Sequence, residues 1–139
     1  EDDGFRQHRI HSLKNAYFTG QKKVDELPAY ITAYDVCINP QMVNDITDGN
    51  YPLKIDEYLA MGKPTVATST HTMRHIFADH THLATNPEEW LSAIDRAVTE
   101  ADDKELAKQR IAFAETHSWG HSVKKIYDII DNFLKEKAT

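Results

Sequence analysis

Two charged residues at the start of one short segment are the best placed in this sequence to bind a ligand. Lys54 and Glu57 stand in "YPLKIDEYLAMGKPTVAT", residues 51–68, and their spacing puts both side chains on roughly one face of a helix. A helix N-terminus with a lysine beside it favours a phosphate. A carboxylate one turn further can accept hydrogen bonds from the two hydroxyl groups of a ribose. The pair is therefore suited to a nucleotide.

The same spacing has a simpler explanation. Lys54 and Glu57 could form an exposed ion pair on a surface helix, and such a pair contributes only a few tenths of a kcal/mol. On spacing alone this explanation is the stronger one. The elements around this pair are needed to choose between a nucleotide site and an exposed ion pair.

The segment around the pair is typical of a loop, a helix, a turn and a strand. Pro52 has the φ of a first helical position, and Ile55 and Leu59 supply a buried face. Gly62 ends the helix, and "TVAT" (65–68) has the composition and length of a short buried strand. In an open α/β sheet, the loop before such a helix lies at the carboxyl ends of the strands, where ligands bind.

The rest of the chain alternates in the same way. Strands separated by helices predict βα units and a parallel sheet, which is an α/β fold. The expected helices cover 4–13, 23–34, 71–79, 86–100, 103–117 and 121–136, the expected strands cover 15–20, 35–40, 65–68 and 82–85, and 41–50 is a polar loop.

Composition bounds the function. A length of 139 residues fits one domain, and the net charge of -6 argues against nonspecific nucleic-acid binding and against a polybasic membrane surface. The one cysteine, Cys37, excludes a disulfide framework within the chain, and its apolar neighbours predict a buried thiol rather than a nucleophile. No run approaches the ~20 apolar residues of a membrane span. The polar N-terminus without methionine suggests a piece of a longer protein.

Histidines and tryptophans offer further candidates. His71, His75, His80 and His82 cluster, so a zinc site is conceivable. No cysteine is near and one acid, Asp79, is local, so surface or capping histidines are the preferred interpretation and no metal is expected. Trp90 and Trp119 fall at helical spacings with other apolar residues and are expected in the core.

The residues of this region carry a family resemblance. The run "NDITDGNYPLKIDEYLAMGKPTVAT" resembles the nucleotide-sugar site of GT-B glycosyltransferases, in particular family 4, the glycosyl transferases of group 1. Segment 15–40 resembles the strand, helix and strand before that site, and "HSW" (117–119) resembles the family's tail signature. The matching residues of the main motif are Asn44, Thr47, Pro52, Leu53, Lys54, Glu57, Tyr58, Ala60, Gly62, Lys63 and Pro64. The resemblance implies a Rossmann-like parallel sheet with flanking helices, the partial C-terminal half of a GT-B fold, formed by residues 1–139 as one truncated domain with C-terminal helices in 103–136.

The resemblance also implies roles for individual residues. Glu57 would bind the donor ribose, and the Leu53 backbone N–H and the Lys54 ammonium would meet the diphosphate. Gln21 and Lys22 lie where the family places the nucleotide base. Many members carry a second glutamate, eight positions before the ribose-binding one, that contacts the donor sugar, but Gly49 stands there in this chain. Asn44 and Thr47 belong to the loop that replaces it.

Parts of a complete enzyme are missing. The acceptor domain and the catalytic groups are expected in an absent N-terminal part. The first strands of the nucleotide domain would lie between the strands expected at 15–20 and 35–40. This chain alone is therefore expected to be inactive.

The resemblance implies a retaining, hexosyltransferase-like enzyme of polysaccharide biosynthesis. It would transfer sugar from UDP-, GDP- or another nucleoside-diphosphate sugar to a sugar, lipid or protein acceptor, without a cofactor. It would be cytoplasmic, with the parent protein peripheral to the inner face of the membrane. Two alternatives stay open: a nonenzymatic α/β regulatory or binding module, and an epimerase or phosphorylase that shares the GT-B layout.

Overall fold

A parallel sheet forms the centre of the molecule. The computed structural model describes residues 8–137. Strands β1 (Cys37–Asn39), β2 (Thr65–Thr68) and β3 (His82–Ala84) lie in the order β1-β2-β3, and both neighbouring pairs are parallel. Ile38 is opposite Val66, and Ala67 is opposite Leu83. The chain thus has the Rossmann-like α/β arrangement that its sequence predicts.

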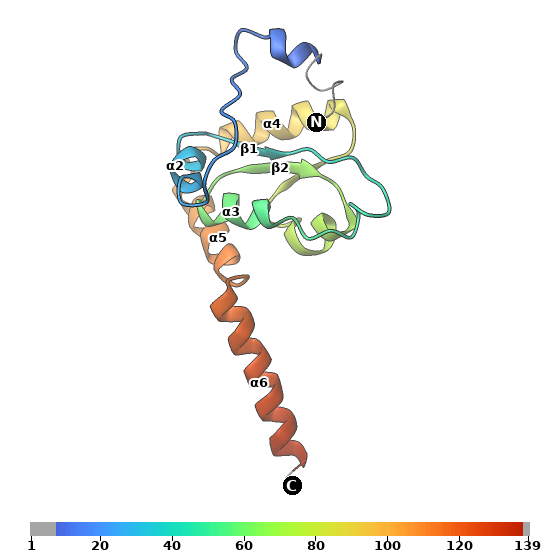
Figure 1. The fold of residues 1–139 in the computed structure, drawn as a ribbon, viewed down its shortest axis with the longest axis vertical. Helices are drawn as coiled ribbons and strands as arrows, with labels where there is room; N and C mark the ends of the chain where they lie inside the picture. The colour runs from blue at the N-terminus through green and yellow to red at the C-terminus, as the bar shows by residue number, and fades with distance from the viewer. Residues whose placement is uncertain (1–7, 138–139) are drawn as a thin grey trace.

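Helices cover both faces of the sheet (Figure 1). The helices are η1 (Arg9–Ser12, a 3-10 helix), α2 (Leu27–Thr32), α3 (Leu53–Ala60), η2 (Met73–Phe77, a π-helix), α4 (Pro87–Thr99), α5 (Lys104–Glu115) and α6 (Trp119–Lys137). In the view of Figure 1, α4 lies above the strands, and α3 and α5 lie below them. A sheet with helices on both faces buries its strands, and all four residues of β2 are buried.

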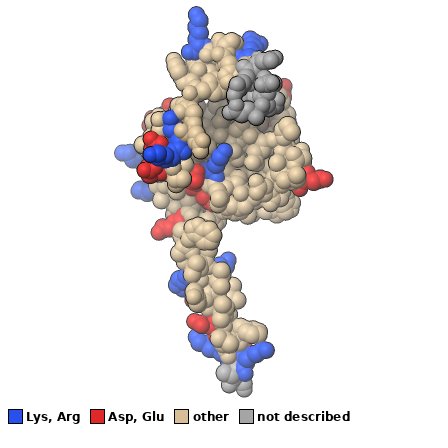
Figure 2. Space-filling view, in the orientation of Figure 1, with Lys and Arg blue, Asp and Glu red and all other residues tan. Residues whose placement is uncertain are grey.

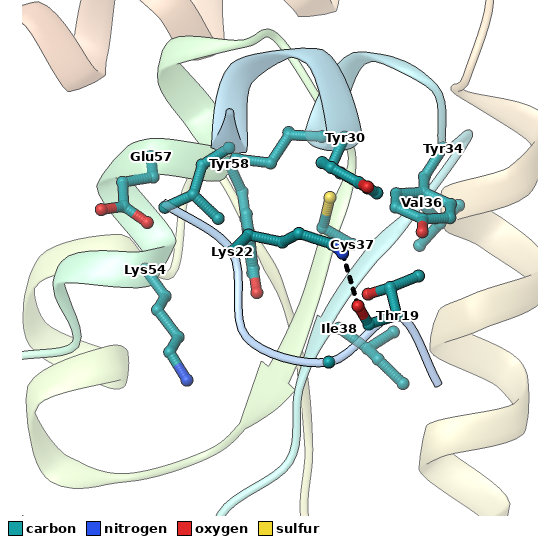
Figure 3. Close-up of a pocket in the computed structure, with 13 residues that line it drawn as sticks. Thr19, Lys22, Tyr30, Tyr34, Val36, Cys37, Ile38, Lys54, Glu57 and Tyr58 are labelled. Atoms are coloured by element: carbon teal, nitrogen blue, oxygen red, sulfur yellow. Dashed lines mark hydrogen bonds between the residues drawn. The ribbon is translucent and has the colours of Figure 1, made fainter. Parts of the chain in front are cut away.

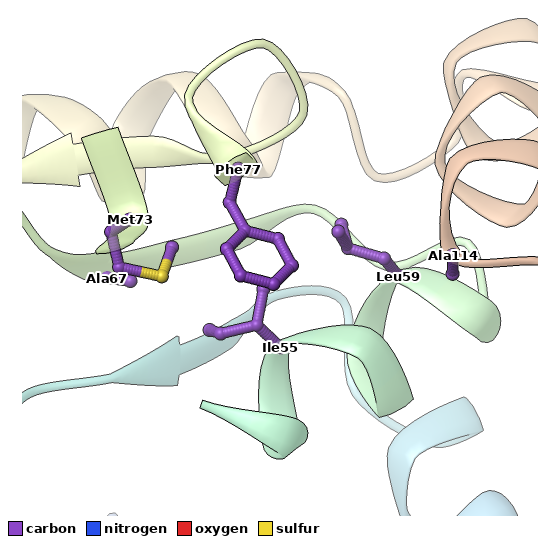
Figure 4. Packing of buried hydrophobic residues seen from close by; sticks show 6 residues of the cluster. All are labelled: Ile55, Leu59, Ala67, Met73, Phe77 and Ala114. Carbon is purple, nitrogen blue, oxygen red and sulfur yellow. The ribbon is translucent and has the colours of Figure 1, made fainter. Parts of the chain in front are cut away.

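Two apolar clusters fill the space between these layers. Successive strand residues point to opposite faces, so Val66 and Ala84 of the sheet pack against Ala93 and Ala97 of α4, while Ala67 faces the other cluster. The second cluster, shown in Figure 4, consists of Ile55, Leu59, Ala67, Met73, Phe77 and Ala114. It attaches α3 to the sheet, to η2 and to α5, so the orientation of α3 is set by the core.

Local signals in the sequence fix several helix ends. Asn86 Oδ1 accepts a hydrogen bond from the Glu89 N–H at 2.9 Å, and Pro87 is the first residue of α4, as predicted. Gly62 has a φ of +72°, and its N–H donates to Leu59 O at 2.8 Å. Both capping predictions are confirmed. Pro52 is the N-cap of α3 rather than its first residue, which is a shift of one position.

The strand expected at 15–20 is wrong. These residues form no strand; they run as irregular chain until Gly20, where φ is +68°. A strand needs a neighbour for its backbone hydrogen bonds, and among the described residues β1 pairs only with β2. Within residues 8–137, segment 15–20 has no strand partner.

Other elements differ in extent. The helix expected at 23–34 is limited to α2, with Pro28 in its first turn, and the strand expected at 35–40 is limited to β1. Of the helix expected at 4–13, residues 4–7 lie outside the described residues and 9–12 form η1. The helix expected at 71–79 contains the π-helical turn η2. The strand at 82–85 and the helices at 103–117 and 121–136 are confirmed as β3, α5 and α6.

Helix α6 projects away from the body in Figure 1. It has no buried residue within the described chain, and Figure 2 shows Lys, Arg, Asp and Glu scattered along it between residues of other kinds. The Trp119 side chain is 87% exposed, so its predicted core position is wrong. Helical spacing gathers apolar residues on one face but does not supply a surface to cover that face. Trp90, by contrast, packs against the cluster beneath α4.

Candidate functional site

A pocket of about 370 Å3 opens beside α3 (Figure 3). Three separate parts of the chain form its walls: segment 19–22, helix α2 with the residues that follow it, and α3. The lining residues are Thr19, Gly20, Lys22, Leu27, Tyr30, Ile31, Tyr34, Val36, Cys37, Ile38, Lys54, Glu57 and Tyr58. The structure thus brings Lys22, Lys54 and Glu57 together, although 35 positions separate Lys22 from Glu57 in the sequence (57 - 22).

Lys54 and Glu57 both line this pocket, and Figure 3 shows them projecting from one side of α3. Both residues are exposed. Among the ion pairs between described residues, none joins them. The structure therefore shows two exposed charges on one surface helix that do not pair with each other. Both charges remain open to a ligand.

The entrance of α3 is open to an anion. Its N-cap, Pro52, makes no side-chain capping bond, and the Ile55 N–H donates to Pro52 O at 2.9 Å. The N–H groups of Leu53 and Lys54 have no carbonyl before them within the helix. They point out of its positive end, where a negative group is stabilised. The Leu53 side chain is exposed and does not line the pocket.

Lys22 crosses the opposite side of the pocket. Its Nζ donates to Thr19 O at 2.5 Å and lies 4.8 Å from the centroid of the Tyr30 ring. Gln21, which the resemblance pairs with Lys22, is exposed and is not among the lining residues. The buried Cys37 thiol forms part of the wall, and desolvation raises its pKa from 9.0 to about 11. Cys37 is therefore a protonated wall residue at neutral pH.

Asn44 and Thr47 form hydrogen bonds with each other and lie outside the pocket that Lys54 and Glu57 line. Asn44 Oδ1 accepts from the Ile46 N–H at 3.0 Å and the Thr47 N–H at 2.9 Å. Thr47 Oγ1 accepts from the Asn44 N–H at 3.0 Å and donates to Met42 O at 2.5 Å. Asp48 Oδ1 accepts from the His71 N–H at 2.7 Å. These bonds give loop 41–50 a defined shape and attach it to the start of the segment that contains η2.

The sequence did not reveal the contacts of Asp56, a residue of α3 that does not line the pocket. The Tyr51 hydroxyl donates to Asp56 Oδ2 at 2.6 Å, and His117 Nδ1 contacts Asp56 Oδ1 at 2.8 Å. Burial and the Asp56 carboxylate raise the pKa of Tyr51 well above its usual range. The "HSW" motif contains His117, but nothing in its local sequence indicates Asp56 as its partner.

The four clustered histidines make separate contacts. The rings of His71 and His75 stack at 4.0 Å, and His80 stacks on Phe113 at 4.0 Å. His82 Nε2 lies 3.0 Å from Glu100 Oε1, and Glu100 also pairs with the buried Arg110. Within residues 8–137, no group of three or more potential ligands is arranged to hold a metal ion.

The fold and the pocket define a class of protein. A parallel sheet with flanking helices and a charged helix entrance at one end corresponds to the partial C-terminal half of a GT-B fold. Residues 2–100 match the family described as "Glycosyl transferases group 1". The chain therefore belongs to this glycosyltransferase family.

A curated relative supports the same family. This relative, the Bacillus subtilis (strain 168) protein named "Putative teichuronic acid biosynthesis glycosyltransferase TuaH", is 28% identical over 110 residues. The match covers 77% of this chain and 28% of that protein, so the chain spans well under half of its relative. No solved structure matches the chain significantly. Among the described helices, none is long and apolar enough to cross a membrane.

Proposed function

We propose that this chain is the donor-binding part of a glycosyltransferase that uses a nucleoside-diphosphate sugar. One observation carries the proposal: Lys54 and Glu57 stand one turn apart at the open entrance of α3, line the same pocket and do not pair with each other. A positive group for the diphosphate and a carboxylate for the ribose are thus available at matching positions. Family membership supports the choice of donor class.

The helix entrance would stabilise the leaving group. Sugar transfer breaks the bond between the anomeric carbon and the diphosphate, so negative charge develops on the diphosphate oxygens. The N–H groups of Leu53 and Lys54, the helix dipole and the Lys54 ammonium would meet that charge. Because these groups are already oriented in the folded chain, little reorganisation accompanies the reaction.

The remaining residues would place the rest of the donor. Glu57 would accept hydrogen bonds from the ribose hydroxyls. Lys22, with Gln21 beside it, would lie next to the nucleotide base near Tyr30. Asn44 and Thr47 would shape the loop next to the donor sugar through the bonds that they make with each other. No cofactor enters this scheme.

The complete enzyme would need more than this domain. We infer that residues 1–139 form one truncated donor domain and that an N-terminal domain supplies the acceptor site and the catalytic groups. The chain alone would then bind a donor without transferring its sugar. The name of the Bacillus relative supports a role in making a cell-envelope polysaccharide. Such a role suits a cytoplasmic hexosyltransferase at the inner face of the membrane, acting on a sugar, lipid or protein acceptor.

Titration calorimetry of this chain with UDP, GDP and ADP tests the proposal. We expect at least one nucleoside diphosphate to bind, and the matching monophosphate to bind less tightly because it presents less charge to α3. The matching nucleoside serves as the control without phosphate. Absence of binding by every diphosphate at millimolar concentration, or equal affinity for diphosphate and nucleoside, would overturn the assignment.

A further inference from the structure

One carboxylate joins three parts of the chain behind the proposed donor site. Asp56 lies on α3, its side chain is 19% exposed, and its two oxygens have different partners. Oδ2 accepts from the Tyr51 hydroxyl, and Oδ1 faces His117 Nδ1 at 2.8 Å. A carboxylate can only accept, so Nδ1 is the ring nitrogen that carries the proton. Asp56 is therefore an organised acceptor with both oxygens in use.

The two donors come from separate parts of the chain, although their rings lie 6.3 Å apart. Tyr51 belongs to the loop that enters α3, and His117 lies between the end of α5 at Glu115 and the start of α6 at Trp119. The bond to His117 spans 61 residues of sequence. The entrance of α3 is thus attached both to its own loop and to the junction that leads into α6.

Aromatic packing fixes these donors in place. The Phe113 and His117 rings lie 4.6 Å apart, and the Phe77 ring lies 5.5 Å from Tyr51 and 5.7 Å from His117. Phe77 is fully buried. Tyr51 and His117 each rest on this buried ring, which limits the positions from which they can donate to Asp56.

Helix α3 needs such support. It has eight residues, and its N-cap makes no side-chain bond. A helix of this length is marginal by itself in water and depends on tertiary contacts. Ile55 and Leu59 anchor its buried face in the core. In its first turn, the Asp56 carboxylate adds polar contacts to Tyr51 and His117.

We propose that Asp56 is a positioning residue for the donor site. Through Tyr51 and His117 it holds the first turn of α3, and with it the N–H groups of Leu53 and Lys54, in the orientation that receives the diphosphate. Asp56 does not line the pocket of Lys54 and Glu57, so it acts through the helix and not by touching the donor. This inference rests on the proposed function.

Hydrogen exchange in the ligand-free chain gives the first test. We expect Asp56→Asn and His117→Ala to raise amide exchange in α3 about tenfold, since each removes a charge-assisted bond, while exchange in α4 stays unchanged. His117→Asn should restore protection because its side-chain N–H can stand where Nδ1–H stood. Tyr51→Phe keeps the ring packing, loses one bond, and should have a smaller effect. Asp95→Asn, an exposed acid of α4, is the control.

Affinity for the diphosphate that the wild-type chain binds gives the second test. It should fall about tenfold in Asp56→Asn and His117→Ala and recover in His117→Asn. Unchanged amide exchange in α3 in both Asp56→Asn and His117→Ala would overturn the proposal, whether or not the chain binds a ligand. Faster exchange with unchanged affinity would also overturn it, because Asp56 would then be structural only. If the wild-type chain binds no nucleotide, the proposed function fails, and the exchange data separately show whether Asp56 holds α3.

Discussion

Gly62 and Ala107 bring the end of α3 against α5 at a point where a side chain on residue 62 would be crowded. A Cβ atom on Gly62 would lie 3.1 Å from Ala107 Cβ, and the φ of Gly62 is +72°. The glycine therefore serves two purposes. It ends the helix that carries Lys54 and Glu57, and it lets that helix approach α5.

We expect Gly62→Ala to destabilise the chain by about 1–2 kcal/mol, from the left-handed backbone together with the close contact at Ala107. Gly49→Ala is the matched control, because a Cβ there meets nothing within 4 Å and its φ is not positive. Urea unfolding of the three proteins measures the difference. Equal midpoints for both variants would contradict this account of the α3–α5 contact.

Local patterns made much of the fold predictable. The capping signals at Asn86 and Gly62 are contained in a few adjacent residues, and the strand Thr65–Thr68 has the β-branched composition of a buried strand. Segment 15–20 has the aromatic residues of a strand, but in the described part of the chain it pairs with no other strand. Trp119 has helical spacing, but in the described chain nothing covers it. Predictions failed where an element depends on a partner that the local sequence does not supply.

Buried aromatic packing at the Phe77 position gives a second prediction. Phe77, the last residue of η2, is fully buried in the cluster with Ile55 and Leu59 of α3, and its ring contacts the Tyr51 and Phe113 rings. Phe77→Ala should lower the free energy of unfolding by about 3–5 kcal/mol, because it leaves a cavity in the core. Leu91→Ala, at a side chain that is 67% exposed, should cost much less. Denaturant unfolding followed by circular dichroism compares the two, and similar losses would place Phe77 outside the core.

Cys37 should react slowly with iodoacetamide in the folded chain. Its pKa of about 11 leaves roughly a thousandth of the thiol ionised at pH 8, against about a tenth for a thiol with the ordinary pKa of 9.0. Alkylation followed by mass spectrometry, with and without urea, should show a native rate at least about a hundredfold lower. Equal rates would mean that the thiol is not buried.

The raised pKa of Cys37 also makes the stability of the fold depend on pH. The folded pKa lies above the unfolded value, so the contribution of a neutral Cys37 is fully present below pH 9 and is lost as pH rises toward about 11. A Cys37→Ala variant, which cannot ionise at this position, should lose less stability over that interval. Parallel curves for both proteins would contradict the raised pKa.

Lys54 should contribute to the binding of the phosphate groups and not to the binding of the nucleoside. Lys54→Ala should weaken binding of a nucleoside diphosphate about tenfold and leave the corresponding nucleoside unaffected, since the ammonium is assigned to the diphosphate. Lys108→Ala removes the same charge from an exposed lysine of α5 that pairs with Glu105 and is the control. Calorimetric titration of both variants decides: equal weakening would mean that Lys54 acts only through net charge.

The site was predictable to the extent that it lies on one helix. The spacing of Lys54 and Glu57 follows from α3 and needed no other element. The walls formed by Tyr30 and Cys37 come from separate elements, so no local pattern could indicate them. The bond between Asp56 and His117 spans 61 residues and became visible only in three dimensions.

The central claim is that the Glu57 carboxylate binds the ribose of the donor. Glu57→Gln should weaken nucleoside-diphosphate binding about tenfold to a hundredfold, because a neutral amide accepts hydrogen bonds less strongly and presents a donor to a hydroxyl. Glu88→Gln makes the same charge change at an exposed acid in the first turn of α4 and should bind like the wild type. Calorimetric titration of the three proteins is the direct measurement. Equal losses in both variants, or no loss in Glu57→Gln, would contradict the assignment of Glu57 to the ribose.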